Sequence, residues 1–192
     1  MTLQEEFNLL FPQYKKREEG HALLTERTCE VIKQVYEVTK PERMLEIGFN
    51  AGHTAFGWLS MFPELTYHSV DICQHSYTET HGKILEKEFG DRFKFGNIDS
   101  RKLNGDVIRM LAYDMVFIDG DHSFEGLRHD YEICSKAKVK WILIDDYTLA
   151  NYIKSFLDHI NTSENHPYTM VDVYEYDDHD ATSHMALFRR ID

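Results

Sequence analysis

The clearest clue to the architecture lies in residues 44–54, which read MLEIGFNAGHT. An apolar run carries Glu46 near its end and is followed by Gly48 and Gly52, after which the pattern becomes helical. Glycines at these positions let the backbone approach a ligand closely where a side chain would block it. A strand, a glycine turn and a helix in this order are typical of nucleotide-binding α/β folds.

The same alternation continues along the chain. Short apolar runs predict strands, and Leu, Ile, Phe and Met at helical spacing predict helices between them. The predicted strands are 43–47, 66–71, 92–96, 114–118, 140–144, 169–174 and 183–189, and the predicted helices are 53–62, 74–89, 101–112, 124–137 and 149–160. This order predicts a Rossmann-like, doubly wound α/β sheet of seven strands, mostly parallel. Because no helix separates the last two runs, the sheet should end in an antiparallel hairpin.

The chain length predicts one domain over residues 1–192, since too little chain remains for a second full domain. Residues 1–40 form a leading helical segment, with an amphipathic helix over 20–39 that stops before Pro41. Residues 41–192 form the Rossmann-like core.

Charge and composition exclude several classes of partner. The chain has 21 Lys and Arg against 33 Asp and Glu, a formal charge of -12, which disfavours nucleic acid and anionic membranes as partners. The three cysteines form no CxxC pair, and the sequence has neither a signal-peptide pattern nor a membrane-spanning apolar run. We therefore expect a cytoplasmic protein that acts on a small molecule, and a homo-oligomer remains open.

Acidic residues follow the first two strands. Glu46 is placed to engage the ammonium group of an amino acid moiety, although a purely structural turn is the alternative. Asp71 ends the second strand, where an acid can accept hydrogen bonds from both ribose hydroxyls of a nucleoside. The spacing of Gly48 and Gly52 differs from the dinucleotide and phosphate-loop patterns, which disfavours an NAD-dependent reductase.

Further acids follow the third, fourth and fifth strands. Asp99 and Ser100 suit either the adenine amino group or the start of a helix, and both interpretations stay open. Asp119, Asp145 and Asp146 follow neighbouring strands, which in a parallel sheet lie about 4.8 Å apart. Three such carboxylates predict an all-oxygen site for Mg²⁺, Mn²⁺ or Ca²⁺. The alternative is that Asp145 and Asp146 only end a strand and cap the next helix.

About three quarters of the chain resembles class I S-adenosylmethionine (SAM)-dependent methyltransferases. Residues 117–126, FIDGDHSFEG, followed by DDY at 145–147, look like the metal-dependent sugar and small-molecule O-methyltransferases, which include macrolide and aminocoumarin sugar methyltransferases. The resemblance implies the following roles: Glu46, Gly48, Asn50 and Gly52 at the methionine end of SAM, Asp71 at the ribose, Asp99 and Ser100 at the adenine, Asp119, Asp145 and Asp146 on Mg²⁺, and Asp121 or His122 as general base.

The chemistry implied is methyl transfer to a hydroxyl of a sugar or another vicinal diol. The sulfonium methyl is already electrophilic, so the enzyme must align an acceptor oxygen and remove its proton. Two alternatives remain: a metal-independent methyltransferase with a nitrogen or carboxylate acceptor, and a non-catalytic nucleoside-binding module. Related enzymes carry additional segments over the acceptor. Here the helix over 20–39 or a partner subunit is expected to supply that cover, and a polar loop at 175–184 either borders the pocket or is simply solvated.

Overall fold

The computed structural model of the chain describes residues 1–12, 14, 23–148, 150–163, 166–178 and 181–192. Within these residues one sheet of seven strands has the order β3-β2-β1-β4-β5-β7-β6. The strands are β1 (Arg43–Ile47), β2 (Thr66–Asp71), β3 (Phe93–Asn97), β4 (Met115–Ile118), β5 (Trp141–Ile144), β6 (Tyr168–Asp178) and β7 (Ala181–Arg190). The first five pair in parallel, whereas β7 is antiparallel to both β5 and β6. The predicted fold class is confirmed.

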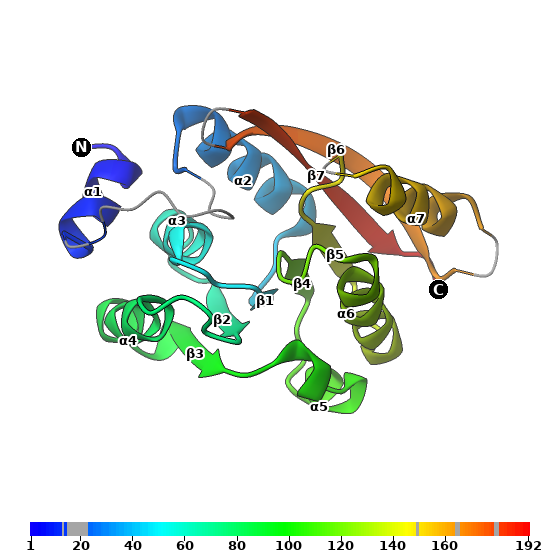
Figure 1. Ribbon diagram of the computed structural model, residues 1–192, viewed down its shortest axis with the longest axis horizontal. Coiled ribbons are helices and arrows are strands. Elements are labelled where there is room, and N and C mark those ends of the chain that lie inside the picture. Colours follow the sequence, from blue (N-terminus) through cyan, green and yellow to red (C-terminus); the bar gives the residue numbers. More distant parts are fainter. Residues whose placement is uncertain (13, 15–22, 149, 164–165, 179–180) are drawn as a thin grey trace.

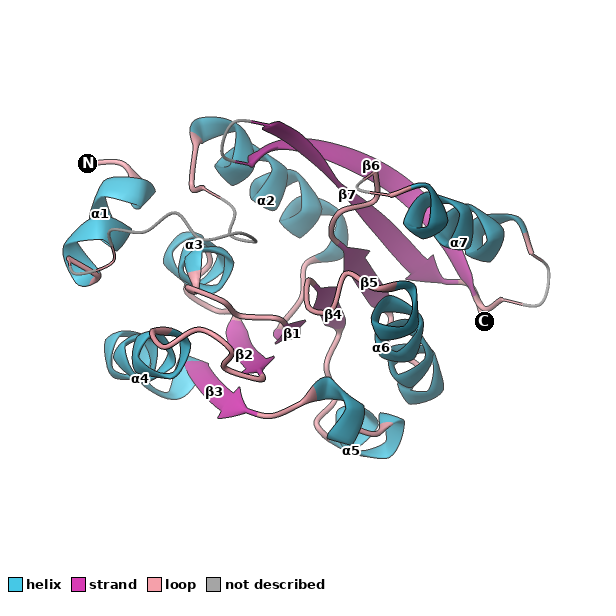
Figure 2. Cartoon of the chain, viewed as in Figure 1, coloured by secondary structure: helices cyan, strands magenta, loops and turns pink. Residues whose placement is uncertain are grey.

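Helices cover both faces of this sheet (Figures 1 and 2). They are α1 (Leu3–Leu10), α2 (Glu26–Thr39), α3 (His53–Met61), α4 (Thr78–Phe89), α5 (Gly105–Met110), α6 (Phe124–Ala137) and α7 (Asn151–Thr162), with short 3-10 turns η1 (Gly90–Arg92) and η2 (Ser100–Lys102). Because successive strand residues point to opposite faces, β1 sends Met44 into the apolar core under α1–α4 and Leu45 into the core under α5–α7. Two cores therefore fix the sheet between two helical layers.

Several predicted bounds change for local reasons. The predicted helix over 101–112 is only α5, because Asn104 caps its start: the amide of Val107 donates a hydrogen bond to Oδ1 of Asn104. The predicted helix over 20–39 begins at Glu26, because Thr25 caps the amide of Thr28; residues 20–22 lie outside the described residues. Residues 175–184 are largely strand rather than loop, and the two positions 179–180 are not described.

The sequence predicted a helical segment over residues 1–40 but did not place α1 within it. Thr2 and Glu5 cap its start reciprocally, and Phe7 is fully buried and stacks on His53 with ring centroids 3.8 Å apart. Just beyond the helix, Phe11 stacks on His81 of α4. The N-terminal segment therefore packs over the first turns of α3 and α4, beside the loop that follows β1.

Among the described residues, we find no helix that combines the length and apolar character needed to cross a membrane.

Candidate active site

The turn after β1, which we call the glycine turn (residues 48–52), is built from left-handed backbone. Gly48 has φ 97°, Asn50 φ 48° and Gly52 φ 88°. A Cβ on Gly48 would lie 1.9 Å from the carbonyl oxygen of Asp119, so only glycine fits there. This close approach brings the end of β1 directly against the end of β4.

Asp71, at the end of β2, holds the glycine turn in shape. Its Oδ2 accepts hydrogen bonds from the amides of Phe49 and Asn50, both at 2.9 Å, and its Oδ1 accepts one from the amide of Cys73 at 2.6 Å. On the other side, the Tyr77 hydroxyl donates to Oδ1 of Asn50 at 2.6 Å. Because each carboxylate oxygen has two lone pairs, Asp71 still has acceptor capacity for a ligand.

Glu46 is a buried acid beneath the glycine turn. Its side chain is on β1, only 1% of the residue is exposed, and Ser69 donates a hydrogen bond to Oε2 at 2.5 Å. Burial raises the pKa of Glu46 to about 8; the Ser69 bond opposes this, while the charges of Asp119 and Asp71 add to it. The site therefore favours a neutral Glu46 unless a cation comes close.

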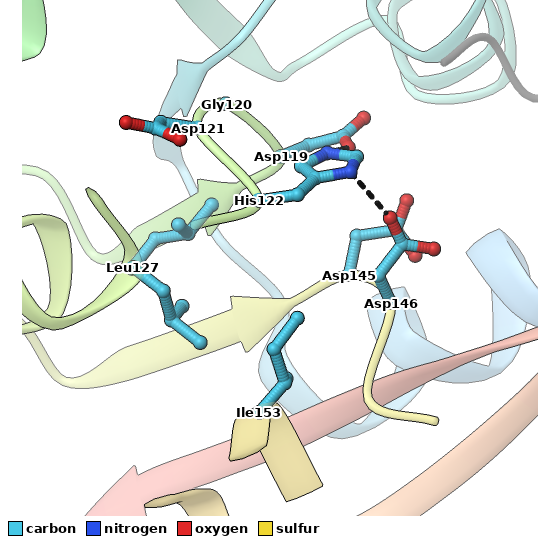
Figure 3. A pocket seen from close by; sticks show the side chains of 9 residues that line it. Asp119, Gly120, Asp121, His122, Leu127, Asp145, Asp146 and Ile153 are labelled. Carbon is cyan, nitrogen blue, oxygen red and sulfur yellow. Dashed lines mark ion pairs between the residues drawn. The ribbon is translucent and has the colours of Figure 1, made fainter. Parts of the chain in front are cut away.

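Asp119, His122, Asp145 and Asp146 come together at the ends of β4 and β5, and we call this group the acid cluster (Figure 3). His122 lies between two of the carboxylates: Nδ1 is 2.8 Å from Oδ2 of Asp146, and Nε2 is 3.6 Å from Oδ1 of Asp119. Leu127 and Ile153 supply the apolar lining of the same pocket. The sequence prediction that these acids meet at one edge is thus matched by their placement.

The cluster concentrates negative charge in a poorly solvated place. Burial raises the pKa of both Asp119 and Asp145, and for Asp145 the neighbouring charges of Asp119 and Asp146 add to the effect. Burial also acts on Asp146, but the hydrogen bond and charge of His122 outweigh it and lower that pKa. Hydrogen bonds with Asp119 and Asp146 hold the pKa of His122 well above its ordinary 6.5. At neutral pH His122 is therefore an imidazolium that balances part of this charge.

The donors suit a hard divalent cation in their chemistry, because carboxylate oxygens are its preferred ligands. In the described part of the chain, however, no three His, Cys, Asp or Glu side chains are arranged as ligands of one metal ion. The ring of His122 lies between Asp119 and Asp146 and pairs with both carboxylates (Figure 3). These pairs raise the pKa of His122, so this arrangement of side chains favours the imidazolium as the cation that balances them.

Asp121 is not part of the acid cluster. Its Oδ1 accepts a hydrogen bond from the amide of Ser123 at 2.9 Å, and its side chain packs so closely on Gly126 that a Cβ there would lie 2.4 Å away. The carboxylate consequently points away from His122 (Figure 3). The sequence suggested Asp121 or His122 as general base. Both residues line the pocket, but only His122 pairs with carboxylates of the acid cluster.

Asp121 instead faces a second group of acids near the ends of β3 and β4. Asp99 accepts hydrogen bonds from both the backbone and the guanidinium of Arg101, so it caps η2. Asp130 of α6, which the sequence did not single out, is 1% exposed, and the hydroxyl of Ser100 is the hydrogen-bonding group that acts on it. Burial raises its pKa to about 6, with the Ser100 hydroxyl opposing the shift. The placement of Asp99 favours the capping interpretation without deciding its contact with adenine.

The fold and this arrangement of strand-end residues define a class I SAM-dependent methyltransferase. The model of the methyltransferase domain family matches residues 45–147, which include the glycine turn and the acid cluster, and the chain belongs to this family.

Solved structures share the fold over nearly the whole chain. The O-methyltransferase TomG from Streptomyces achromogenes, in complex with SAM, is 13% identical with a TM-score of 0.63, and all of both chains is covered. An O-methyltransferase from Bacillus cereus, in complex with SAH (S-adenosylhomocysteine), is 11% identical with a TM-score of 0.64 over 98% of this chain and 90% of that one. The SAH-bound methyltransferase PaMTH1 from Podospora anserina is 15% identical with a TM-score of 0.63 over 99% of this chain and 88% of that one.

Proposed function

We propose that this protein, as a single domain over residues 1–192, transfers the methyl group of SAM to a hydroxyl of a small molecule that carries a vicinal diol, such as a sugar. The observation that carries the proposal is the contact of Gly48 with the backbone of Asp119. Because of this contact, the glycine turn and the acid cluster lie on either side of one site. A sulfonium bound at the turn would therefore lie next to His122.

The glycine turn is the proposed SAM site. Glu46 is a buried acid whose raised pKa would fall on contact with the methionine ammonium group, which gives that group an electrostatic reason to bind there. The backbone of Gly48, Asn50 and Gly52 faces the methionine end. Asp71 keeps one lone pair, on Oδ1, for a ribose hydroxyl, and we assign Asp99 and Ser100 to the adenine end in addition to the cap that Asp99 forms.

His122 is the proposed proton acceptor. In the reaction a lone pair of the acceptor oxygen attacks the methyl carbon, the carbon–sulfur bond breaks with its electrons going to sulfur, and the hydroxyl proton goes to the base. An imidazolium cannot take this proton, so His122 works as a base only when the charge of Asp119 and Asp146 is compensated otherwise. A divalent cation held by Asp119, Asp145 and Asp146 would supply that compensation and would polarise the acceptor hydroxyl.

The test is SAH production from SAM with a panel of sugars and other vicinal diols, in Mg²⁺ and in excess chelator. We expect turnover with at least one diol, and a loss of turnover in chelator. Calorimetric SAM binding without turnover on any acceptor would identify a non-catalytic module. Turnover that survives chelation would remove the metal from the proposal and leave the metal-independent alternative, in which the pairing of His122 with Asp119 and Asp146 must loosen before His122 can take a proton.

A further inference from the structure

The C-terminal hairpin of β6 and β7 reaches the acid cluster, although it lies outside the residues matched by the family model. Tyr176 of β6 and Ser183 of β7 are direct partners in the antiparallel register. Directly opposed residues on one face have Cβ atoms roughly 5 Å apart. The hairpin therefore presents two hydroxyls side by side, both on residues that are less than one tenth exposed.

The first hydroxyl meets Asp145. The Tyr176 hydroxyl lies 2.9 Å from both Oδ1 and Oδ2 of Asp145 and donates its proton to this carboxylate. Asp145 is 9% exposed and Tyr176 2%, so water competes little for the bond. A buried donor that faces both oxygens ties the position of the Asp145 carboxyl group to β6.

The second hydroxyl, that of Ser183, donates a hydrogen bond to Asp146, and Asp146 pairs with His122. Ser183 donates to Oδ1 of Asp146 at 3.0 Å, while Oδ2 of the same carboxylate faces Nδ1 of His122 at 2.8 Å. Ser183 and His122 thus lie on opposite oxygens of one side chain. Removing the Ser183 hydroxyl frees Asp146 to rotate, and the orientation of the imidazole changes with it.

The backbone between the two carboxylates is also held by the hairpin. Asp146 has φ 56°, a left-handed conformation that is uncommon for residues other than glycine and that is maintained only when the surroundings enforce it. The next residue, Tyr147, donates its amide to the carbonyl of His184 at 2.9 Å, and the Thr148 hydroxyl lies 2.8 Å from Nδ1 of His184. This backbone turn aims two consecutive side chains at two hydroxyls of one strand pair.

We propose that Tyr176 and Ser183 are positioning residues for the methyl-transfer site, with Ser183 orienting His122 through Asp146 and Tyr176 orienting Asp145. The inference depends on the proposed function only for the identity of the reaction that the two residues serve. A purely structural hydroxyl would change stability alone, whereas a positioning hydroxyl also changes the environment of the His122 ring.

The chain offers a matched control. Tyr174 is two residues before Tyr176 on the same strand and the same face, is 6% exposed, and packs in the same apolar core. We therefore compare Ser183→Ala and Tyr176→Phe with Tyr174→Phe, and we use Ser183→Thr as the conservative variant that restores the hydroxyl. Two measurements are made on each: the long-range ¹H–¹⁵N spectrum of the His122 imidazole, assigned with His122→Gln, and the steady-state constants for SAM and the acceptor.

We expect Ser183→Ala to move the His122 nitrogen resonances, and both Ser183→Ala and Tyr176→Phe to lower kcat about 10-fold or more, as losses of such supporting hydrogen bonds do, with the KM for SAM unchanged. Tyr174→Phe should leave both measurements at the wild-type values, and Ser183→Thr should restore them. Wild-type His122 resonances in Ser183→Ala, or a wild-type kcat in Tyr176→Phe, would overturn the inference. This spectrum is obtained without turnover, so a wild-type protein that methylates no acceptor would refute the proposed function and leave this test intact.

Discussion

The glycine turn and the acid cluster meet at Gly48, yet they handle negative charge in opposite ways. At the turn, the carboxylate of Asp71 is satisfied by three backbone amides from two loops. In the cluster, burial raises the pKa of Asp119 and Asp145, and His122 is the cation that compensates. The turn is therefore preorganised by its own backbone, whereas the cluster retains charge that a bound cation or a proton can neutralise. Glu46, which lies below the turn, resembles Asp119 and Asp145 because burial raises its pKa as well.

The largest expected effect comes from disrupting the contact between Gly48 of the glycine turn and the backbone of Asp119. Gly48→Ala places a Cβ 1.9 Å from the Asp119 carbonyl at φ 97°, so the backbone of one region must move. We expect a loss of about 3–5 kcal/mol in the free energy of unfolding, together with loss of SAM binding. Urea denaturation and calorimetry measure these two quantities.

The matched control for this variant is Gly90→Ala. Gly90 also has positive φ, 59°, but no described atom lies within 4 Å of its added Cβ. It should cost only about 2 kcal/mol, from backbone strain alone. Equal losses in the two variants would mean that the contact between Gly48 and Asp119 contributes nothing.

A second prediction concerns Glu46. Since its folded pKa of about 8 lies above the ordinary value of 4.5, the native state binds more protons than the unfolded state between these pH values. The free energy of unfolding therefore falls as pH rises from 4.5 to 8. Glu46→Gln should remove this slope and add about 3 kcal/mol of stability at pH 7. Denaturation at pH 5 and pH 8 measures the difference.

The same substitution should weaken SAM binding, because the amide offers no charge to an ammonium group. We expect a loss of about 10- to 100-fold in affinity by calorimetry. Glu88→Gln, at an exposed position, is the control and should change neither quantity. A Glu46→Gln protein that binds SAM as tightly as wild type would separate Glu46 from the cofactor.

The position of these acids could be predicted from the sequence because a parallel sheet brings the carboxyl ends of its strands to one edge. Glu46, Asp71 and Asp119 are fixed by that topology once the strands are known. The hydroxyls of Tyr176 and Ser183 could not be predicted in this way. Their contacts depend on the register of an antiparallel hairpin with a bulge between Met170 and Asp172, and a shift of one residue would turn both side chains to the other face.

Two other features escaped prediction for different reasons. Asp121 was named beside His122 as a general base because the family resemblance implies either residue, but the Ser123 amide donates a hydrogen bond to Asp121 in a local turn that directs the carboxylate away from His122. That Asp-x-Ser pattern was available in the sequence as a signal. Asp130 is a polar residue on the buried side of α6, and nothing in helical periodicity distinguishes it from the exposed acids of the same helix.

Asp130 provides a third, smaller effect and tests whether uncompensated charge extends beyond the acid cluster. Its pKa is raised from 3.8 to about 6, mainly by burial, so stability should decrease as pH rises between these values and stay level above. Asp130→Asn should raise the free energy of unfolding at pH 7 by about 3 kcal/mol, slightly less than Glu46→Gln does. Denaturation at pH 4 and pH 7 checks the sign. The exposed Asp91→Asn serves as control, and a destabilised Asp130→Asn would show that this carboxylate has a charged partner after all.

The smallest effect tests the preorganised region. Both oxygens of Asp71 accept backbone amides, so an asparagine there must present its NH₂ group to at least one donor whichever way it is turned. Asp114 also accepts two amides, those of Glu42 and Arg43, but both reach the single oxygen Oδ2, which an asparagine carbonyl can replace. Asp71→Asn should therefore cost about 1–2 kcal/mol more in the free energy of unfolding than Asp114→Asn. Equal costs would mean that the glycine turn keeps its shape without a carboxylate that accepts amides on both oxygens. The glycine turn and the acid cluster would then differ only in how deeply their carboxylates are buried.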